Sequence, residues 1–426
     1  MSKIVDHAAA RDDRSFFGQP RSLANIFGVE MWERVSFYGM QGILLLYLYF
    51  SAADGGLGTP QTTAAGIVGA YGGGVYLSTI LGAWIADRLL GSERVLFYSA
   101  IVIMLGHIAL AVVPGIGGLV AGLILVAIGS GGLKANATSV VGTLYAPDAA
   151  RRVPDPLPRS RWSRCIVIAI ATLGVIVVLG LTGMITASNL VTIVIGLAIV
   201  ATIAYFVVIL TNRQITTVER KRVYAFIPLF IASAAFWSLY QRQFTVVTIY
   251  SDERLDRALF GWEMPVSWVQ SINPVLIIVL SGIFAALWTR LGTRQSSTPI
   301  KFAVGTAVMG GAFLLFLPFA GGAANSTPLL AMIGILLVFT IAELLLSPVG
   351  LSVATKLAPE VFKTQMVALF FLSVALGFAV SGVLATWCAT APGRVYFSVL
   401  GSIAIVLGLL LVLISRPVLR LMGGVR

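Results

Sequence analysis

Charged residues are scarce in this chain of 426 residues. Asp, Glu, Lys and Arg make up 11% of it, whereas soluble globular proteins carry about a quarter. Hydrophobic residues make up 58%, and the mean hydropathy is +0.95. This composition excludes a soluble globular protein. A single signal peptide or membrane anchor is excluded as well, because apolar stretches recur from one end of the chain to the other.

Cysteine and histidine are nearly absent, with two residues of each. Cys165 and Cys388 both lie in or beside apolar segments, so the sequence offers neither a disulfide framework nor a zinc site. It also has no Ser/His/Asp arrangement, no metal-ligand cluster and no phosphate-binding loop. We therefore expect neither an enzyme nor a protein with a bound cofactor.

Long apolar segments are what the sequence has in abundance. An α-helix needs about 20 apolar residues to cross a bilayer, and an open strand would leave its backbone unsatisfied in hydrocarbon. The sequence thus predicts an all-α polytopic membrane protein with about 12 transmembrane helices. The predicted spans are residues 26–50, 63–86, 95–114, 117–141, 164–185, 188–211, 222–247, 265–289, 300–320, 328–353, 361–387 and 394–415.

Basic residues are distributed unevenly among the connections between these spans. If the N-terminus is cytoplasmic, 23 of the 29 Lys and Arg residues fall in cytoplasmic connections and three in outer ones. Because Lys and Arg accumulate in cytoplasmic loops, both termini are predicted to be cytoplasmic. The net charge of +12 is then explained by topology in the lipid bilayer, and nucleic-acid binding is not expected.

The chain divides into membrane-embedded segments with no soluble domain inserted between them. Residues 147–163 are rich in Pro and Arg and lack apolar periodicity, so they are interpreted as a cytoplasmic linker. The predicted parts are a cytoplasmic N-terminal segment (1–25), a four-span bundle (26–146), the linker (147–163), a transmembrane hairpin (164–211), a six-helix bundle (222–415) and a cytoplasmic tail (416–426).

Ionisable residues inside the predicted spans are candidates for function, because a charge within a bilayer costs at least a few kcal/mol. Glu30, Glu33 and Arg34 occupy positions i, i+3 and i+4 of the first span and therefore share one helix face. They are predicted to point into a cavity. The alternative is that they snorkel to the cytoplasmic end.

Lys134 in the fourth span and Glu343 in the tenth form a second set of candidates. Three interpretations are open: they pair with each other, they bind a zwitterionic ligand, or they form a purely structural pair. In the eighth span, Gln270, Asn273 and Pro274 place polar groups beside a kink, which is typical of the lining of a pathway.

Two further polar residues carry weaker signals. His107, isolated in the third span, is more simply a packing histidine than a proton relay. Arg242, near the outer end of the seventh span, allows either outward snorkelling or a role in a gate.

Five segments carry a family resemblance. GAWIADRLLGSER, residues 82–94, resembles the cytoplasmic loop motif of the major facilitator superfamily. EMWERVSFYG, residues 30–39, resembles the ExxERFxYYG signature of the proton-dependent oligopeptide transporters. IGSGGLKANATSVVGTLY, QSINPVLII and ELLLSPVGLS resemble three more segments of that family, in the same order. The chain is therefore similar to this family over nearly its whole length.

The resemblance implies a major-facilitator-type helix bundle in the cell membrane that imports di- and tripeptides with protons, driven by the proton gradient and without a cofactor. Lys134 would serve the peptide carboxylate or proton coupling, and Glu343 the peptide amino group. By match to the family's motifs, the implied roles are proton coupling for Glu30, Glu33 and Arg34, peptide binding for Tyr38, Tyr76, Lys134, Asn273 and Glu343, and a conformational role for Asp87, Arg88 and Arg94.

The sequence departs from the family pattern in three ways. Phe370 stands where the family carries a tryptophan in span eleven, which keeps an apolar wall but loses the indole donor. Gln41 and Gln241 stand where the family carries an Arg and a Glu of an outer gate, so a neutral hydrogen-bonded pair is expected. Spans five and six of the family have no counterpart, and the hairpin 164–211 resembles the extra helix pair of bacterial members. We expect an incomplete N-terminal half, a peripheral hairpin and a central cavity open laterally.

Three functions are therefore open. The first is proton-coupled peptide symport, impaired by the missing helices. The second is transport of another small substrate by a facilitator-superfamily protein, and the third is a folded remnant that does not transport.

Overall fold

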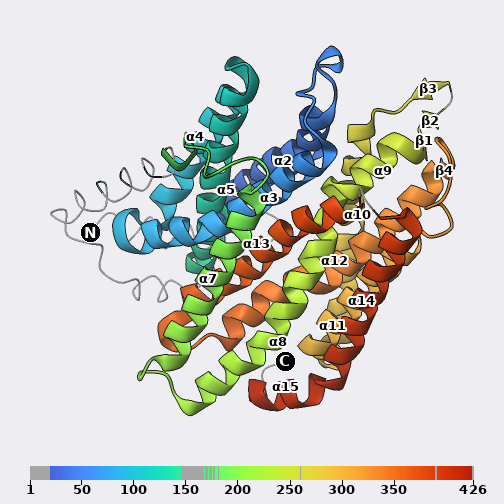
Figure 1. Ribbon diagram of the computed structural model, residues 1–426. Coiled ribbons are helices and arrows are strands. Elements are labelled where there is room, and N and C mark those ends of the chain that lie inside the picture. The colour runs from blue at the N-terminus through green and yellow to red at the C-terminus, as the bar shows by residue number, and fades with distance from the viewer. Residues whose placement is uncertain are drawn as a thin grey trace. The chain divides into compact units, whose positions relative to one another are not determined.

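The computed structural model describes residues 20–145, 167, 171, 175, 178–180, 182–259, 261–388 and 391–424 (Figure 1). Within these residues the chain forms thirteen α-helices. They are α2 (Arg21–Tyr49), α3 (Gln61–Ile85), α4 (Ser92–Val112), α5 (Gly115–Tyr145), α7 (Leu190–Thr211), α8 (Thr217–Tyr240), α9 (Val246–Arg254), α10 (Val269–Leu291), α11 (Thr298–Leu314), α12 (Leu329–Leu357), α13 (Lys363–Cys388), α14 (Gly393–Leu413) and α15 (Ser415–Met422). The strands are β1 (Leu255–Asp256), β2 (Ala258–Leu259), β3 (Trp262–Glu263) and β4 (Thr327–Pro328).

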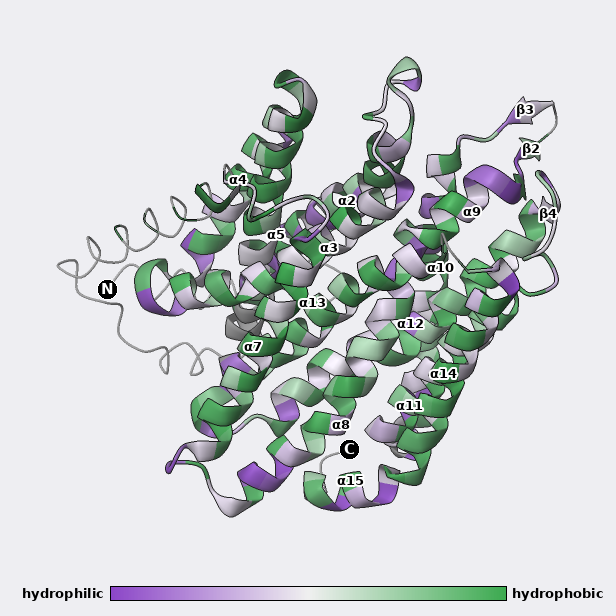
Figure 2. Cartoon of the chain, viewed as in Figure 1, coloured by the Kyte–Doolittle hydropathy of each residue, from purple (hydrophilic) through white to green (hydrophobic). Residues whose placement is uncertain are grey.

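Eleven of the twelve predicted spans coincide with an α-helix. The other, 164–185, lies largely outside the described residues. Nine helical stretches of the described chain are long and apolar enough to cross a membrane, and hydrophobic residues cover most of their length (Figure 2). Helix α2 is not among the nine, because charged and polar residues in its first half lower its hydropathy. The strands are additions to this helical fold, in segments between helices.

The seventh predicted span, 222–247, does not run as one helix. Helix α8 ends at Tyr240, a 3₁₀ turn covers Gln241–Phe244, and α9 begins at Val246. The backbone carbonyl of Gln243 accepts hydrogen bonds from the side chains of Gln270, at 2.7 Å, and Thr248, at 3.1 Å. Side chains thus replace the helical N–H donor that this carbonyl would otherwise need.

The chain divides into two compact units by the density of its contacts. The first unit comprises Met1–Met40 and Val75–Thr186, and the second comprises Gln41–Gly74 and Ala187–Arg426. Helices α2 and α3 are continuous, so each contributes one part of its length to each unit.

Glycine permits close helix packing within the first unit. A Cβ at Gly82 of α3 would meet the backbone of Gly132 in α5, and a Cβ at Gly106 of α4 would meet the Gly122 carbonyl of α5. Small residues let helix backbones approach closely, and this drives association where lipid removes the hydrophobic effect. The α3–α5 contact fixes the part of α5 that carries Lys134.

The second unit has a core built on α8 and α11 to α14. Phe316 and Phe397 stack there with ring centroids 4.6 Å apart. Helix α7 packs against α13, and its Val191 and Val194 form a cluster with Ala379 of α13 and Ala70 of α3. Within the described residues, 22% of the most apolar stretch of α7 is buried.

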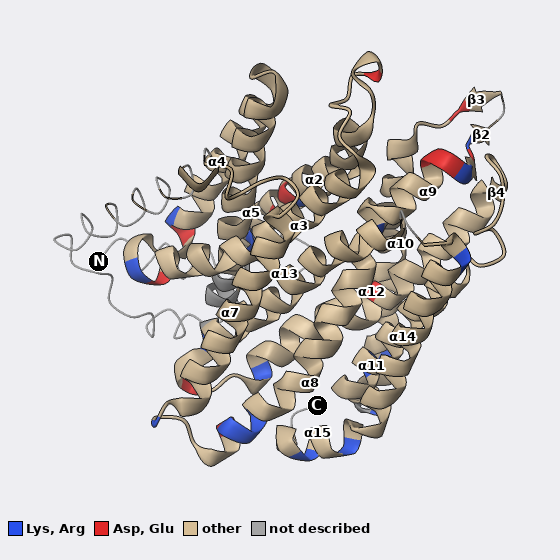
Figure 3. Cartoon of the chain, viewed as in Figure 1, with Lys and Arg blue, Asp and Glu red and all other residues tan. Residues whose placement is uncertain are grey.

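The two ends of the second unit differ in charge and structure. Helix α15 packs against α8 at one end, and basic residues gather there (Figure 3). The other end holds α9 and the strands, with acidic residues on α9 and β3. Strands β1 and β4 pair in parallel, with Leu255 opposite Thr327, and β2 and β3 pair antiparallel.

Candidate functional site

Two of the predicted residues form a buried ion pair in the first unit. Nζ of Lys134, on α5, lies 2.8 Å from Oε2 of Glu33, on α2, and Glu33 is 3% exposed. Nζ also lies 4.7 Å from the ring centroid of Phe37 and 5.5 Å from that of Tyr76. A carboxylate and two aromatic faces thus stabilise one ammonium group. The second carboxylate oxygen of Glu33, Oε1, has no hydrogen-bond partner among the described residues.

Glu30 and Arg34 form a separate pair on α2. Arg34 Nε lies 3.5 Å from Glu30 Oε2, and the two side chains are 62% and 29% exposed. Residues four apart on a helix are neighbours, which explains this pairing. Of the three ionisable residues of the motif, the structure therefore joins Glu33 to another helix and leaves Glu30 and Arg34 with each other.

Of the two tyrosines predicted for the pocket, Tyr76 lies over the Lys134 ammonium group and Tyr38 packs against Phe37. Phe37, which is fully buried, meets Tyr38 edge-on at 5.2 Å and Tyr76 at 6.1 Å between centroids. His107 shares a 2.5 Å hydrogen bond with Ser36 and so links α4 to α2.

Glu343 and Asn273 come together in the second unit. Asn273 Nδ2 donates to Thr340 Oγ1 at 2.9 Å and to Glu343 Oε2 at 3.5 Å, while the Tyr240 hydroxyl donates to Asn273 Oδ1 at 3.3 Å. Asn273 is 1% and Glu343 7% exposed. Lys134 and Glu343 thus belong to different units and have different partners within them.

Sequence reasoning missed Thr340 and Tyr240. Thr340 lies three residues before Glu343 on α12, so helical periodicity places it on the same face and could have found it. No pattern distinguishes Tyr240 from the other aromatic residues of α8. Its contact with Asn273 depends on how α8 and α10 pack.

The neutral pair expected at the gate is hydrogen-bonded. Gln241 Nε2 donates to Gln41 Oε1 at 2.8 Å, and both residues are fully buried in the second unit. A Cβ at Gly72 would lie 3.0 Å from both amide nitrogens, so this glycine of α3 leaves room for the pair.

Arg242 is completely buried, with 0% of its surface exposed, so outward snorkelling is wrong for it. Its Nη1 donates to the Tyr396 hydroxyl, and Nε and Nη2 have no hydrogen-bond partner among the described residues. The same residues include no carboxylate in an ion pair with it.

The loop motif lies where α3 passes into α4. Asp87 and Arg88 fall in a π-helical turn, Ala86–Leu90, and Arg94 lies in the first turn of α4. Gly91 between them has a φ of 82°, which favours glycine. In the part of the chain that the structure describes, Asp87 forms no ion pair.

Comparison with known proteins identifies the family to which this arrangement belongs. The chain matches the profile described as the POT family over residues 93–154 and 153–401. The chain belongs to the POT family. It is 36% identical to the uncharacterized transporter YclF of Bacillus subtilis (strain 168), over 97% of each chain. It is 33% identical to a di-/tripeptide transporter of Lactococcus lactis subsp. cremoris, over 98% of this chain and 99% of that relative.

Solved structures of POT proteins have the same fold. The chain superposes with a TM-score of 0.88 on a peptide transporter POT in complex with sulfate, at 34% identity, with 98% of this chain and 99% of the other covered. For a POT family transporter in complex with 5-aminolevulinic acid the TM-score is 0.86 and the identity 31%, with 95% and 98% covered. The chain is therefore a multi-pass membrane transporter of the major-facilitator type and not an enzyme.

Proposed function

We propose that this POT protein is a proton-coupled symporter that imports di- and tripeptides across the cell membrane, with both termini in the cytoplasm. The observation that carries the proposal is the ion pair between Glu33 and Lys134, buried on helices that cross a bilayer. A charged pair in that setting is retained for function by default. The described activity of the Lactococcus relatives, di-/tripeptide transport, supports the choice of substrate.

Competition for Lys134 couples the proton to the peptide. Glu33 Oε1 has no partner among the described residues and accepts the proton there. Protonation neutralises Glu33 and would leave Lys134 as an uncompensated buried charge, which costs several kcal/mol. A peptide carboxylate that takes the place of Glu33 removes this cost. Proton binding and peptide binding therefore favour each other.

The amino end of the peptide is assigned to Glu343. Its carboxylate accepts from Asn273 at 3.5 Å, a long hydrogen bond that a charged ammonium group replaces with a stronger one. The rings of Tyr38 and Tyr76 supply contacts that tolerate varied side chains. The family motifs imply a role in proton coupling for Glu30 and Arg34. They imply a conformational role for Asp87, Arg88 and Arg94.

We also propose that the N-terminal half lacks spans five and six of the family and that transport is slower as a result. Two observations support this. The two matched segments of the family meet at residues 153 and 154, inside the predicted linker 147–163. The alignments with the Bacillus and Lactococcus relatives run over 478 and 492 residues, more than the 426 of this chain. Alternating access rocks one half of such a transporter against the other, so an incomplete half is expected to impair it.

Uptake of labelled dialanine into proteoliposomes tests the proposal. We expect uptake under an inward proton gradient, abolished by a protonophore and slower than that of the Lactococcus relative measured in parallel. Uptake as fast as that of the relative would contradict the proposed effect of the missing helices. Transport of another small solute but not of dialanine would favour a different substrate. The absence of both gradient-driven uptake and counterflow would identify a non-transporting remnant.

A further inference from the structure

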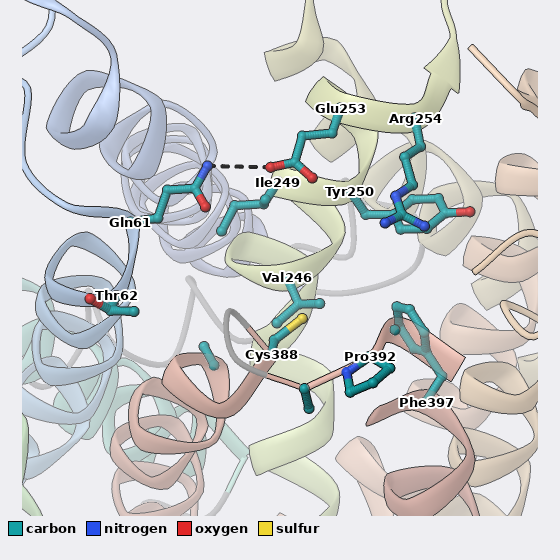
Figure 4. A pocket seen from close by; sticks show the side chains of 13 residues that line it. Gln61, Thr62, Val246, Ile249, Tyr250, Glu253, Arg254, Cys388, Pro392 and Phe397 are labelled. Carbon is teal, nitrogen blue, oxygen red and sulfur yellow. Dashed lines mark hydrogen bonds between the residues drawn. The ribbon is translucent and has the colours of Figure 1, made fainter. Parts of the chain in front are cut away.

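A cavity lies at the α9 end of the second unit, apart from the residues discussed above. It has a volume of about 340 Å³ and is bounded by the first turn of α3, by α9, by the end of α13 and by the start of α14 (Figure 4). Its polar wall includes Gln61, Glu253 and Arg254, and its apolar wall includes Val246, Cys388 and Phe397. We refer to it as the α9 cavity.

One side of the α9 cavity carries a negative charge. Glu253 Oε1 accepts a hydrogen bond from Gln61 Nε2 at 3.4 Å, and both groups are exposed. A hydrogen bond of this length from an uncharged amide donor is weak. An ammonium group would make a shorter and stronger, charge-assisted bond to the same carboxylate.

The other side carries a positive charge held in a fixed position. Arg254 Nη1 donates to the Ala320 carbonyl at 2.5 Å, and its guanidinium carbon lies 5.8 Å from the Tyr250 ring centroid. These contacts orient the guanidinium plane but leave its charge without a carboxylate partner within the described residues. Figure 4 shows Glu253 and Arg254 extending from α9 on different sides of the cavity.

A second positive charge lies behind the cavity wall. The buried guanidinium of Arg242 donates a hydrogen bond to the hydroxyl of Tyr396, and the next residue, Phe397, lines the cavity. A fully buried guanidinium makes the region around it favourable for an anion.

We propose that the α9 cavity is a second binding site, for small zwitterions such as an amino acid or a dipeptide. The ligand's ammonium group binds Glu253, its carboxylate binds Arg254, and its side chain packs against Val246 and Phe397. A volume of about 340 Å³ lies at the lower end of the range for small-molecule pockets. The inference rests on the proposed function only for the choice of a dipeptide as the probe.

Protection of Cys388 from alkylation tests this site. In the full chain with Cys165→Ser, Cys388 is the only thiol and lines the α9 cavity. We measure the rate of its reaction with a maleimide on purified protein, with and without dialanine. At ten times the dissociation constant, dialanine should slow the reaction about tenfold by occupancy alone. N-acetyl-dialanine amide, which carries neither charge, should give no protection.

Variants with matched controls separate the site from indirect effects. Glu253→Gln and Arg254→Gln should each abolish protection by dialanine. Asp256→Asn and Arg394→Gln are the matched controls: they remove one negative and one positive charge from nearby positions outside the cavity lining. Both should leave protection unchanged. Glu343→Gln, in the proposed transport site, should leave protection unchanged as well.

Three outcomes would overturn the inference. Protection that persists in both cavity variants, or that disappears in Glu343→Gln, would mean that Cys388 reports binding elsewhere. If dialanine is transported but does not protect Cys388, the second site is wrong and the proposed function stands. If Cys388 is protected but nothing is transported, the proposed function is wrong and the second site stands.

Discussion

At the scale of single residues, the contrast between Glu33 and Glu30 is informative. Both are acids of one motif on α2, yet Glu33 is buried against Lys134 and Glu30 pairs with the exposed Arg34. Ion pairs in water contribute about 0 to 1 kcal/mol, whereas loss of one partner of a buried pair costs about 3–5 kcal/mol. Protonation of Glu33 therefore changes the free energy of the protein more than protonation of Glu30 does.

We expect Glu33→Gln and Glu343→Gln to have different effects. Glu33→Gln removes the proton acceptor, so gradient-driven uptake should disappear while peptide counterflow, which needs no net proton movement, is preserved. Glu343→Gln should weaken dialanine binding about tenfold or more, because it removes a charged partner of the ammonium group. Uptake, counterflow and equilibrium binding are measured for each variant.

Glu93→Gln is the control for both substitutions. Glu93 is an exposed acid in the first turn of α4 and contributes to neither cluster. If Glu33→Gln and Glu343→Gln behave like Glu93→Gln in all three assays, the proton and amine roles assigned to them are wrong.

At the scale of helices, the face that α3 presents to α13 shows how the second unit is held together. A Cβ at Gly69 would lie 2.6 Å from the Gly382 Cα, and a Cβ at Gly73 would lie 2.9 Å from the Ala375 carbonyl oxygen. Only glycine fits at such distances. This stripe of α3 is the physical reason that residues 41–74 group with the second unit.

Gly69→Ala should therefore destabilise the protein. An added methyl group forces the α3 and α13 backbones apart, at a cost of about 1–3 kcal/mol. Gly74→Ala, five residues along the same helix, is the control. Among the described residues, no atom apart from its own helix backbone and its chain neighbours lies within 4 Å of its added Cβ, so the better helix propensity of alanine should make this change neutral or stabilising. Thermal unfolding of the purified chain compares them, and a higher midpoint for Gly69→Ala than for the unmodified chain would refute the tight packing.

The positions of most helices follow from the length of the apolar segments in the sequence. Most ends of the predicted spans follow Gly, Pro or charge, which act locally, and eleven helices are found where they were expected. The break between α8 and α9 was not predicted. It depends on Gln270, which is distant in sequence and donates to the Gln243 carbonyl at 2.7 Å.

At the scale of the whole molecule, the distribution of Lys and Arg predicts how the chain is oriented in the membrane. Of its 29 basic residues, 23 fall in the connections that are predicted to be cytoplasmic. A thiol introduced by Ser160→Cys, in the linker, should react with an impermeant maleimide only after the cells are opened. Asp54→Cys, in the exposed connection between α2 and α3, should react on intact cells. Both variants are made without Cys165 and Cys388.

The reverse labelling pattern would overturn the predicted orientation. It would also move the proton-coupling cluster to the other side of the membrane, since Glu33 lies in the first half of α2. Labelling of both positions on intact cells would contradict a single topology for the chain.

The sequence by itself determined that the chain is a membrane-spanning helical protein and which ionisable residues to examine. Hydropathy and charge along a single helix decide these properties, because lipid forces each span to satisfy its own backbone. Only the tertiary structure decided which partner each polar residue has. Glu33 pairs with Lys134 from 101 positions away, Arg242 is buried against Tyr396, and Glu253 and Arg254 flank a cavity. These contacts join helices distant in sequence, and helix packing alone brings them together.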